Sequence, residues 1–158
     1  MDYLKEIEFA GVTARLKRIS DTLMHDARRV YEYLNLSIEP NWHLVFLLLK
    51  KEKQLAVTEI SAKLNFSHPA IINIIKKMKS KGYIISSTDT KDSRRQIIQL
   101  SKKAMQELPK LENEWDEIQL VVSQIFDTEF LEKLATVEAN ISEASMLKRL
   151  QLLKEMKK

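Results

Sequence analysis

The chain has 158 residues, among them only two glycines, three prolines and no cysteine. This length suits a single domain with a sizeable core, and the scarcity of glycine and proline predicts a mainly helical fold. The lack of cysteine excludes disulfides, thiolate metal sites and cysteine-based redox sensing.

The longest uninterrupted apolar run is 44–49, which is far too short to cross a membrane. The chain starts with a charged amphipathic pattern and shows no signal peptide. We therefore expect a soluble, cytoplasmic protein that has no membrane partner.

The net charge of +4 is unevenly distributed along the chain. Residues 57–103 contain ten Lys and Arg against three Asp and Glu, whereas residues 104–158 contain seven against eleven and residues 1–56 nine against eight. Such a concentration of positive charge is typical of a surface that binds phosphates. An ordinary solvated basic face is the alternative.

Residues 2–35 are predicted to form one long helix, bent near Gly11. Its apolar residues recur at spacings of three and four and predict a continuous stripe: Leu16, Ile19, Leu23, Ala27, Val30 and Leu34. On the polar side, His25 and the pair Arg28–Arg29 either bind an anionic effector or are simply solvated and salt-bridged.

A linker is predicted at 36–41, with Pro40 at or near the start of the next helix. That helix, 42–51, contains the run 44–49, which is apolar on every side. We therefore expect it to be buried as the centre of the domain.

Residues 58–81 are predicted to form two short helices joined by a tight turn. The first helix spans 58–64, with Thr58 as its cap, and the turn is 65–67. This is the arrangement of a helix-turn-helix.

The second of these helices has clear signals at both ends. Ser67 provides a hydroxyl cap, Pro69 lies in the first turn and Gly82 follows the end. Three apolar residues at helical spacing predict a buried stripe: Ile71, Ile75 and Met78. The opposite side is short, mixed and basic, as a helix in a DNA major groove requires.

Two β-rich runs, 83–87 and 96–100, flank the polar loop 88–95, and residues 55–57 are expected to add a short third strand. Two strands joined by a charged loop directly after such a helix indicate a winged helix-turn-helix. The sequence thus predicts a module that binds double-stranded DNA.

Ser101 is predicted to cap a long helix that reaches about Phe126 and is bent by Pro109. Its apolar residues follow a coiled-coil-like pattern: Ala104, Leu108, Leu111, Trp115, Ile118, Val122 and Ile125. Residues 127–129 are predicted to cap a last helix with a similar stripe. We expect these helices and the first one to form a dimerisation bundle, with a monomeric helical hairpin as the alternative.

Several motifs of this sequence resemble the MarR family of transcriptional regulators. They are Val57–Ser61, Lys81–Ile84, the loop Asp89–Arg94 with its Asp-x-Arg signature at 92–94, and Leu100–Ser101. The resemblance implies a mainly α fold with a small β wing, in which 37–100 form the winged helix-turn-helix. Residues 1–36 and 101–158 then form the helical dimerisation region of a homodimer.

On the second helix of the helix-turn-helix we assign two kinds of contact. The first-turn amides at Ser67 can meet a phosphate, and Lys76 and Lys77 are predicted to bind phosphates, which positions the protein without reading sequence. The residues predicted to face base edges are His68, Pro69, Ala70, Ile72 and Asn73.

Two of these residues suggest a base preference. Asn73 can bind an adenine edge through two hydrogen bonds, and Ile72 can pack on a thymine methyl group. The alternative for Ile72 is one more core isoleucine.

The wing provides a second group of contacts. Arg94 is predicted to enter the minor groove, where narrow A·T-rich stretches concentrate negative potential. Asp92 is expected to pair with Arg94 and to orient its side chain, and Lys91 and Arg95 are expected to contact the flanking backbone.

MarR-like proteins bind small molecules between the dimerisation helices and the winged helix. The resemblance therefore suggests Tyr31, Trp42 and His43 as residues that line an effector pocket, with His25 and Arg28 nearby. The alternative is a core tryptophan and a surface histidine.

The sequence thus predicts a dimeric, sequence-specific regulator, in the first instance a repressor, that binds a pseudo-palindromic operator and is released by a small-molecule effector. The alternative is a winged-helix scaffold that binds protein partners. No nucleophile–base set, metal-ligand cluster or phosphate-binding glycine loop occurs, so we expect no enzymatic activity, cofactor or metal.

Overall fold

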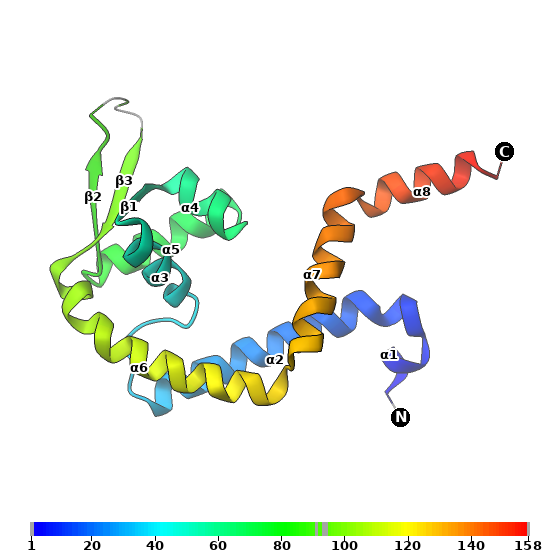
Figure 1. The fold of residues 1–158 in the computed structure, drawn as a ribbon, viewed down its shortest axis with the longest axis horizontal. Coiled ribbons are helices and arrows are strands. Elements are labelled where there is room, and N and C mark those ends of the chain that lie inside the picture. The colour runs from blue at the N-terminus through cyan, green and yellow to red at the C-terminus, as the bar shows by residue number, and fades with distance from the viewer. Residues whose placement is uncertain (1, 91, 93–94, 158) are drawn as a thin grey trace. The chain divides into compact units, whose positions relative to one another are not determined.

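The structure is a computed structural model that describes residues 2–90, 92 and 95–157. It is mainly helical with one small antiparallel sheet, as the sequence predicts (Figure 1). The chain divides into two compact units, one up to Leu111 and one from Glu112. No helix in the described part of the chain is long and apolar enough to span a membrane.

The N-terminal region differs from the single bent helix that we predicted. It comprises the helix α1 (Tyr3–Glu6), the 3₁₀ helix η1 (Glu8–Gly11) and the long helix α2 (Val12–Tyr33). Glu8 has a positive φ of 45°, which interrupts the helix. A Cβ at Gly11 would lie 2.2 Å from the Leu4 carbonyl oxygen, so only glycine allows this close approach.

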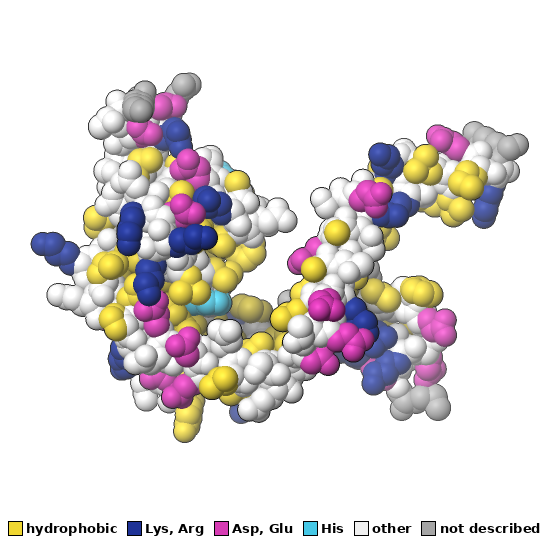
Figure 2. Space-filling model, in the orientation of Figure 1, with side chains coloured by type: hydrophobic (Ala, Val, Ile, Leu, Met, Phe, Trp, Pro, Cys, Tyr) yellow, Lys and Arg dark blue, Asp and Glu magenta, His cyan; other side chains and the backbone are white. Residues whose placement is uncertain are grey.

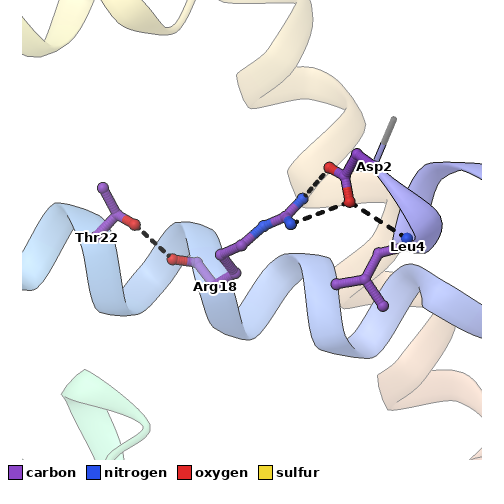
Figure 3. Close-up of polar contacts among 4 residues, drawn as sticks. All are labelled: Asp2, Leu4, Arg18 and Thr22. Atoms are coloured by element: carbon purple, nitrogen blue, oxygen red, sulfur yellow. Dashed lines mark hydrogen bonds and ion pairs between the residues drawn. The ribbon is translucent and has the colours of Figure 1, made fainter.

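An ion pair attaches the N-terminal turn to α2 (Figure 3). The Arg18 guanidinium donates to both carboxylate oxygens of Asp2, over 3.2 and 2.6 Å. Asp2 also accepts a hydrogen bond from the Leu4 amide. The hydrogen bond and charge of Arg18 lower the pKa of Asp2 below its ordinary value. The segment before Gly11 is thus folded back onto α2 and does not extend it.

The winged helix, residues 42–100, has a dense apolar core. It comprises α3 (Trp42–Glu52), β1 (Gln54–Ala56), α4 (Val57–Leu64), α5 (His68–Ser80), β2 (Ile84–Thr88) and β3 (Gln96–Leu100). The strands lie in the order β1-β3-β2, all antiparallel, and the predicted third strand is confirmed. The largest fully buried side chains come from every helix, from the segment between α5 and β2, and from β3: Trp42, Val45, Phe46, Leu49, Ile60, Ile71, Met78, Tyr83 and Ile98.

Two local predictions in this region are wrong. Thr58 does not cap α4, because the helix begins one residue earlier and the Glu59 carboxylate accepts a hydrogen bond from the Ala56 amide over 2.7 Å. The helix α3 is not buried on every side either: Leu47 is 43% exposed, whereas Val45 and Phe46 are fully buried.

The C-terminal helices are α6 (Lys102–Ile125), α7 (Thr128–Glu143) and α8 (Met146–Glu155). The predicted caps are present, since Ser101 accepts from the Ala104 amide over 3.1 Å and Asp127 from the Phe130 amide over 2.7 Å. The single last helix that we predicted is instead two helices. The chain is extended at Ala144, and Ser145 caps α8 through the Lys148 amide.

Candidate nucleic-acid interface

The exposed side of α5 is the centre of the candidate interface. Its other side is anchored in the core by Ile71, Ile74, Ile75 and Met78. All the residues predicted to face base edges are exposed: His68, Pro69, Ala70, Ile72 and Asn73. Ile72 is 47% exposed, which decides against a core role for it.

The turn before α5 fixes the direction in which this helix starts. Asn65 adopts the left-handed conformation, with a φ of 52°, and ends α4. The Ser61 hydroxyl donates to the Phe66 carbonyl oxygen over 2.6 Å and closes the turn. Ser67 then caps α5 by accepting from the Ala70 amide over 3.4 Å. Pro69 has no amide hydrogen and the Ala70 amide is bonded to Ser67, so the His68 amide is the first-turn group that an anion can meet.

Two of the cations that we assigned to phosphates are paired with acids. The Lys77 ammonium lies 2.9 Å from the Glu39 carboxylate, in the segment before α3. The Arg95 guanidinium lies 3.1 Å from Glu59 on α4 and 3.9 Å from Asp89. All these side chains are partly exposed, so the pairs are weak and a phosphate can compete for the cations.

Figure 2 accordingly shows Lys and Arg interspersed with Asp and Glu on the visible face of the winged helix. The side of α5 opposite its buried stripe has no acid of its own. The acids near it come from other elements, which the sequence of the helix alone does not reveal.

Backbone hydrogen bonds close the base of the wing. The Asp89 amide donates to the Arg95 carbonyl oxygen, and the Arg95 amide donates to the Asp92 carbonyl oxygen, each over 2.9 Å. Lys91 and Arg94 lie outside the described residues. The predicted roles of Arg94 in the minor groove and of Asp92 as its partner therefore stay predictions.

A sequence model of the MarR family matches residues 36–95. The winged helix of this chain is therefore similar in sequence to that of the MarR family. The matched range contains α3 to α5, β1 and β2, and thus the exposed side of α5. The comparison with curated proteins gave no match.

Several solved structures share the fold over most of the chain. Overoxidized AbfR bound to DNA is 16% identical, with a TM-score of 0.70, over 88% of this chain and 96% of that one. The C80S mutant of MarR from E. coli, complexed with operator DNA, is 15% identical, with a TM-score of 0.67, over 89% and 99%. MepR of S. aureus in a DNA complex is 21% identical, with a TM-score of 0.66, over 84% and 96%.

The effector residues suggested by the resemblance to the MarR family differ in burial, and their role stays a prediction. Tyr31 and Trp42 are buried, whereas His25 and Arg28 are exposed on α2. His43 is half-buried, with its Nδ1 2.8 Å from the Pro40 carbonyl oxygen. Trp42 therefore occupies a core position, as the alternative in the sequence analysis predicts.

A small cavity of about 170 Å³ does adjoin Trp42 in the winged helix. The sequence did not indicate its other lining residues, which come from the linker and the end of α5: Ser37, Glu39, Lys77, Ser80 and Lys81. The buried Nε1 of Trp42 has no hydrogen-bond partner among the described residues. The same described residues contain no group of three or more His, Asp and Glu side chains that could hold a metal ion.

Proposed function

We propose that this protein is a DNA-binding transcriptional regulator of the MarR type. The observation that carries the proposal is the two-sided character of α5. Four apolar residues anchor one side in the core, while the opposite side is exposed and free of acids: His68, Pro69, Ala70, Ile72 and Asn73. A rigidly supported helix with such a face fits a major groove.

In this proposal, base contacts and phosphate contacts come from different residues. Asn73 binds an adenine edge, and the exposed Ile72 packs on a thymine methyl group. The amides at Ser67, together with Lys76 and Lys77, hold phosphates. On the wing, Arg94 reads the minor groove, Asp92 orients it, and Lys91 and Arg95 contact the backbone.

We further propose that the regulator is a homodimer in which residues 1–36 and 101–158 form the shared helical region. Support comes from apolar side chains that the described chain leaves exposed on α7 and α8: Phe130, Leu134, Val137, Ile141, Leu147 and Leu150. An amphipathic helix with an uncovered apolar face calls for a partner surface. A second copy provides the matching face by symmetry.

A twofold dimer presents two recognition helices to half-sites about 10 base pairs apart, so its operator is a pseudo-palindrome. We propose that the protein represses transcription from such a site. A small molecule that favours a different separation of the two winged helices then lowers DNA affinity by a shift of population.

The alternative function is a winged-helix scaffold for protein partners. It is favoured by the apolar side chains that the winged helix exposes, Phe66, Ile72 and Ile85. A protein-binding surface commonly has such apolar anchors. The two functions differ in how binding depends on DNA sequence and on the wing.

Selection of bound duplexes from a random pool tests the proposal. We expect a pseudo-palindrome to be enriched and its affinity to fall steeply with salt. Arg94→Ala is expected to weaken binding at least tenfold, about 1.4 kcal/mol, and to lower the salt slope. Lys110→Ala, which removes an exposed cation from α6, is the control. If no sequence is enriched and Arg94→Ala changes nothing, the scaffold alternative holds.

A further inference from the structure

Tyr83 occupies a central place in the core of the winged helix. It directly follows Gly82 at the end of the segment after α5, and it is only 1% exposed. Its ring meets two aromatic rings of α3 edge-on: Trp42 at 6.0 Å and Phe46 at 5.5 Å between centroids. Such contacts stabilise the core through the ring alone and do not need the hydroxyl.

The hydroxyl of Tyr83 has partners on two other segments. One is Glu107 on α6, at 2.8 Å, and the other is Ser37, at 3.1 Å, in the linker 34–41 between α2 and α3. A carboxylate only accepts hydrogen bonds, so Tyr83 donates to Glu107 and Ser37 donates to Tyr83. Burial raises the pKa of the Tyr83 hydroxyl, the bond with Ser37 lowers it, and Glu107 raises it further.

Further contacts connect the start of α6 to Tyr83 and to the two residues before it. The Lys103 ammonium lies 4.2 Å from the centre of the Tyr83 ring and donates to the Lys81 carbonyl oxygen over 2.8 Å. Ser101 donates its amide to the Tyr83 carbonyl oxygen over 2.9 Å and its hydroxyl to the Gly82 carbonyl oxygen over 2.6 Å. The segment that follows α5, residues 81–83, is thus attached directly to the start of α6.

The linker and α6 are the two connections by which the chain enters and leaves the winged helix. One buried hydroxyl bonds to both of them. Its two hydrogen bonds are partly buried, where they are stronger than at the surface. Their loss would remove a constraint on the directions of α2 and α6 and would leave the aromatic packing in place.

We propose that Tyr83 is a positioning residue, whose hydroxyl ties the linker and α6 to the winged helix and so limits the separations that two recognition helices can adopt. The consequence for DNA rests on the proposed function. The consequence within one chain rests on the contacts of Tyr83 alone. The two consequences are therefore measured separately.

The first experiment measures the constraint within one chain. The protein has no cysteine, so spin labels can be attached to Ala14→Cys on α2 and Ala62→Cys on α4, both exposed. Dilution with unlabelled protein keeps the measured dipolar distance intramolecular. We expect a narrow distance distribution that broadens clearly with Tyr83→Phe. Ser37→Ala, which removes only the linker bond, should broaden it less.

The matched control is Tyr33→Phe, which deletes the same hydroxyl from a residue that is highly exposed at the end of α2. We expect it to leave the distribution unchanged. An equally narrow distribution in wild type, Tyr83→Phe and Ser37→Ala overturns the inference, whatever the protein does with DNA. A purely structural role lowers the melting temperature of Tyr83→Phe without broadening the distribution, and this result also overturns it.

The second experiment compares selected operators whose half-site spacing is changed by one base pair. We expect wild type to lose affinity strongly on the altered site. In Tyr83→Phe this penalty should shrink by at least about fivefold, because each of the two lost hydrogen bonds is worth about 1 kcal/mol. An unchanged penalty in Tyr83→Phe contradicts the inference. If wild type binds no duplex selectively, the proposed function fails and the spin-label result decides on Tyr83.

Discussion

The winged helix and the C-terminal helices differ in how far their apolar side chains are buried. In the winged helix, residues from all three helices and the sheet are fully buried, among them Val45, Phe46, Ile60 and Ile98. No residue of α7 or α8 is buried, and Ile141 is 65% exposed although it belongs to an apolar stripe. Burial of apolar surface is the main stabilising term in folding. The winged helix therefore contains its own source of stability, whereas the apolar side chains of α7 and α8 stay exposed in the described chain.

The largest effect should come from the core of the winged helix. Phe46→Ala is expected to lower the free energy of unfolding by about 3–5 kcal/mol, because it leaves a cavity that cannot collapse fully. Leu47→Ala, the next residue on α3, should cost no more than about 1 kcal/mol because its side chain is partly exposed. Urea unfolding of both variants measures the difference. Similar losses for the two would contradict the core described above.

A charge in the apolar stripe of α7 should weaken association and leave the core of the winged helix unchanged. Ile141→Glu is expected to weaken the dimer by more than about thirtyfold, since an unpaired charge in an interface costs several kcal/mol. Sedimentation over a range of concentrations measures this, and stability should depend on concentration. Glu138→Gln on the same helix is the control. A variant with unchanged association would show that this stripe is not the dimer surface.

The neighbouring residues Thr58 and Glu59 test how α4 begins. Glu59→Ala removes the acceptor for the Ala56 amide and the partner of Arg95, so we expect a loss of about 1 kcal/mol in the free energy of unfolding. Thr58→Ala should be close to neutral, because Thr58 caps nothing. A larger loss for Thr58→Ala than for Glu59→Ala would reverse the assignment.

The smallest effect concerns the ion pair between Asp2 and Arg18. The pKa of Asp2 is lowered in the folded chain, so the pair stabilises the N-terminal turn fully above about pH 4. This contribution is lost as the pH falls through the lowered pKa. Hydrogen exchange of the amides in 3–11, compared in wild type and Asp2→Asn, measures it. Equal protection of both proteins at neutral pH would contradict the account.

Features set by neighbouring residues were predictable from the sequence. The caps at Ser67, Ser101 and Asp127 placed the starts of three helices correctly, because a cap acts on an amide only three residues away. The exposed side of α5 followed from helical spacing once the buried stripe was identified. Ser145 before α8 is a cap of the same kind, and without it the prediction joined α7 and α8 into one helix.

Features that depend on distant residues were not predictable. Ser37 and Glu107 are 46 and 24 residues from Tyr83 in sequence, and nothing in their own neighbourhoods marks them as its partners. The pairing of Lys77 with Glu39 is equally remote. The break near Glu8 was missed for another reason: a positive φ at glutamate has no sequence signal, and only Gly11, three residues later, indicated a bend there.

The claim that α5 reads bases can be tested directly by comparing Asn73→Ala and Lys76→Ala on the selected operator and on its single-base variants. We expect Asn73→Ala to lose about 1–3 kcal/mol on the operator and to relax the preference at one adenine. Lys76→Ala should weaken binding to all sequences alike and lower the salt slope by about one. If both variants lose affinity uniformly, with every base preference retained, α5 does not read the operator through Asn73.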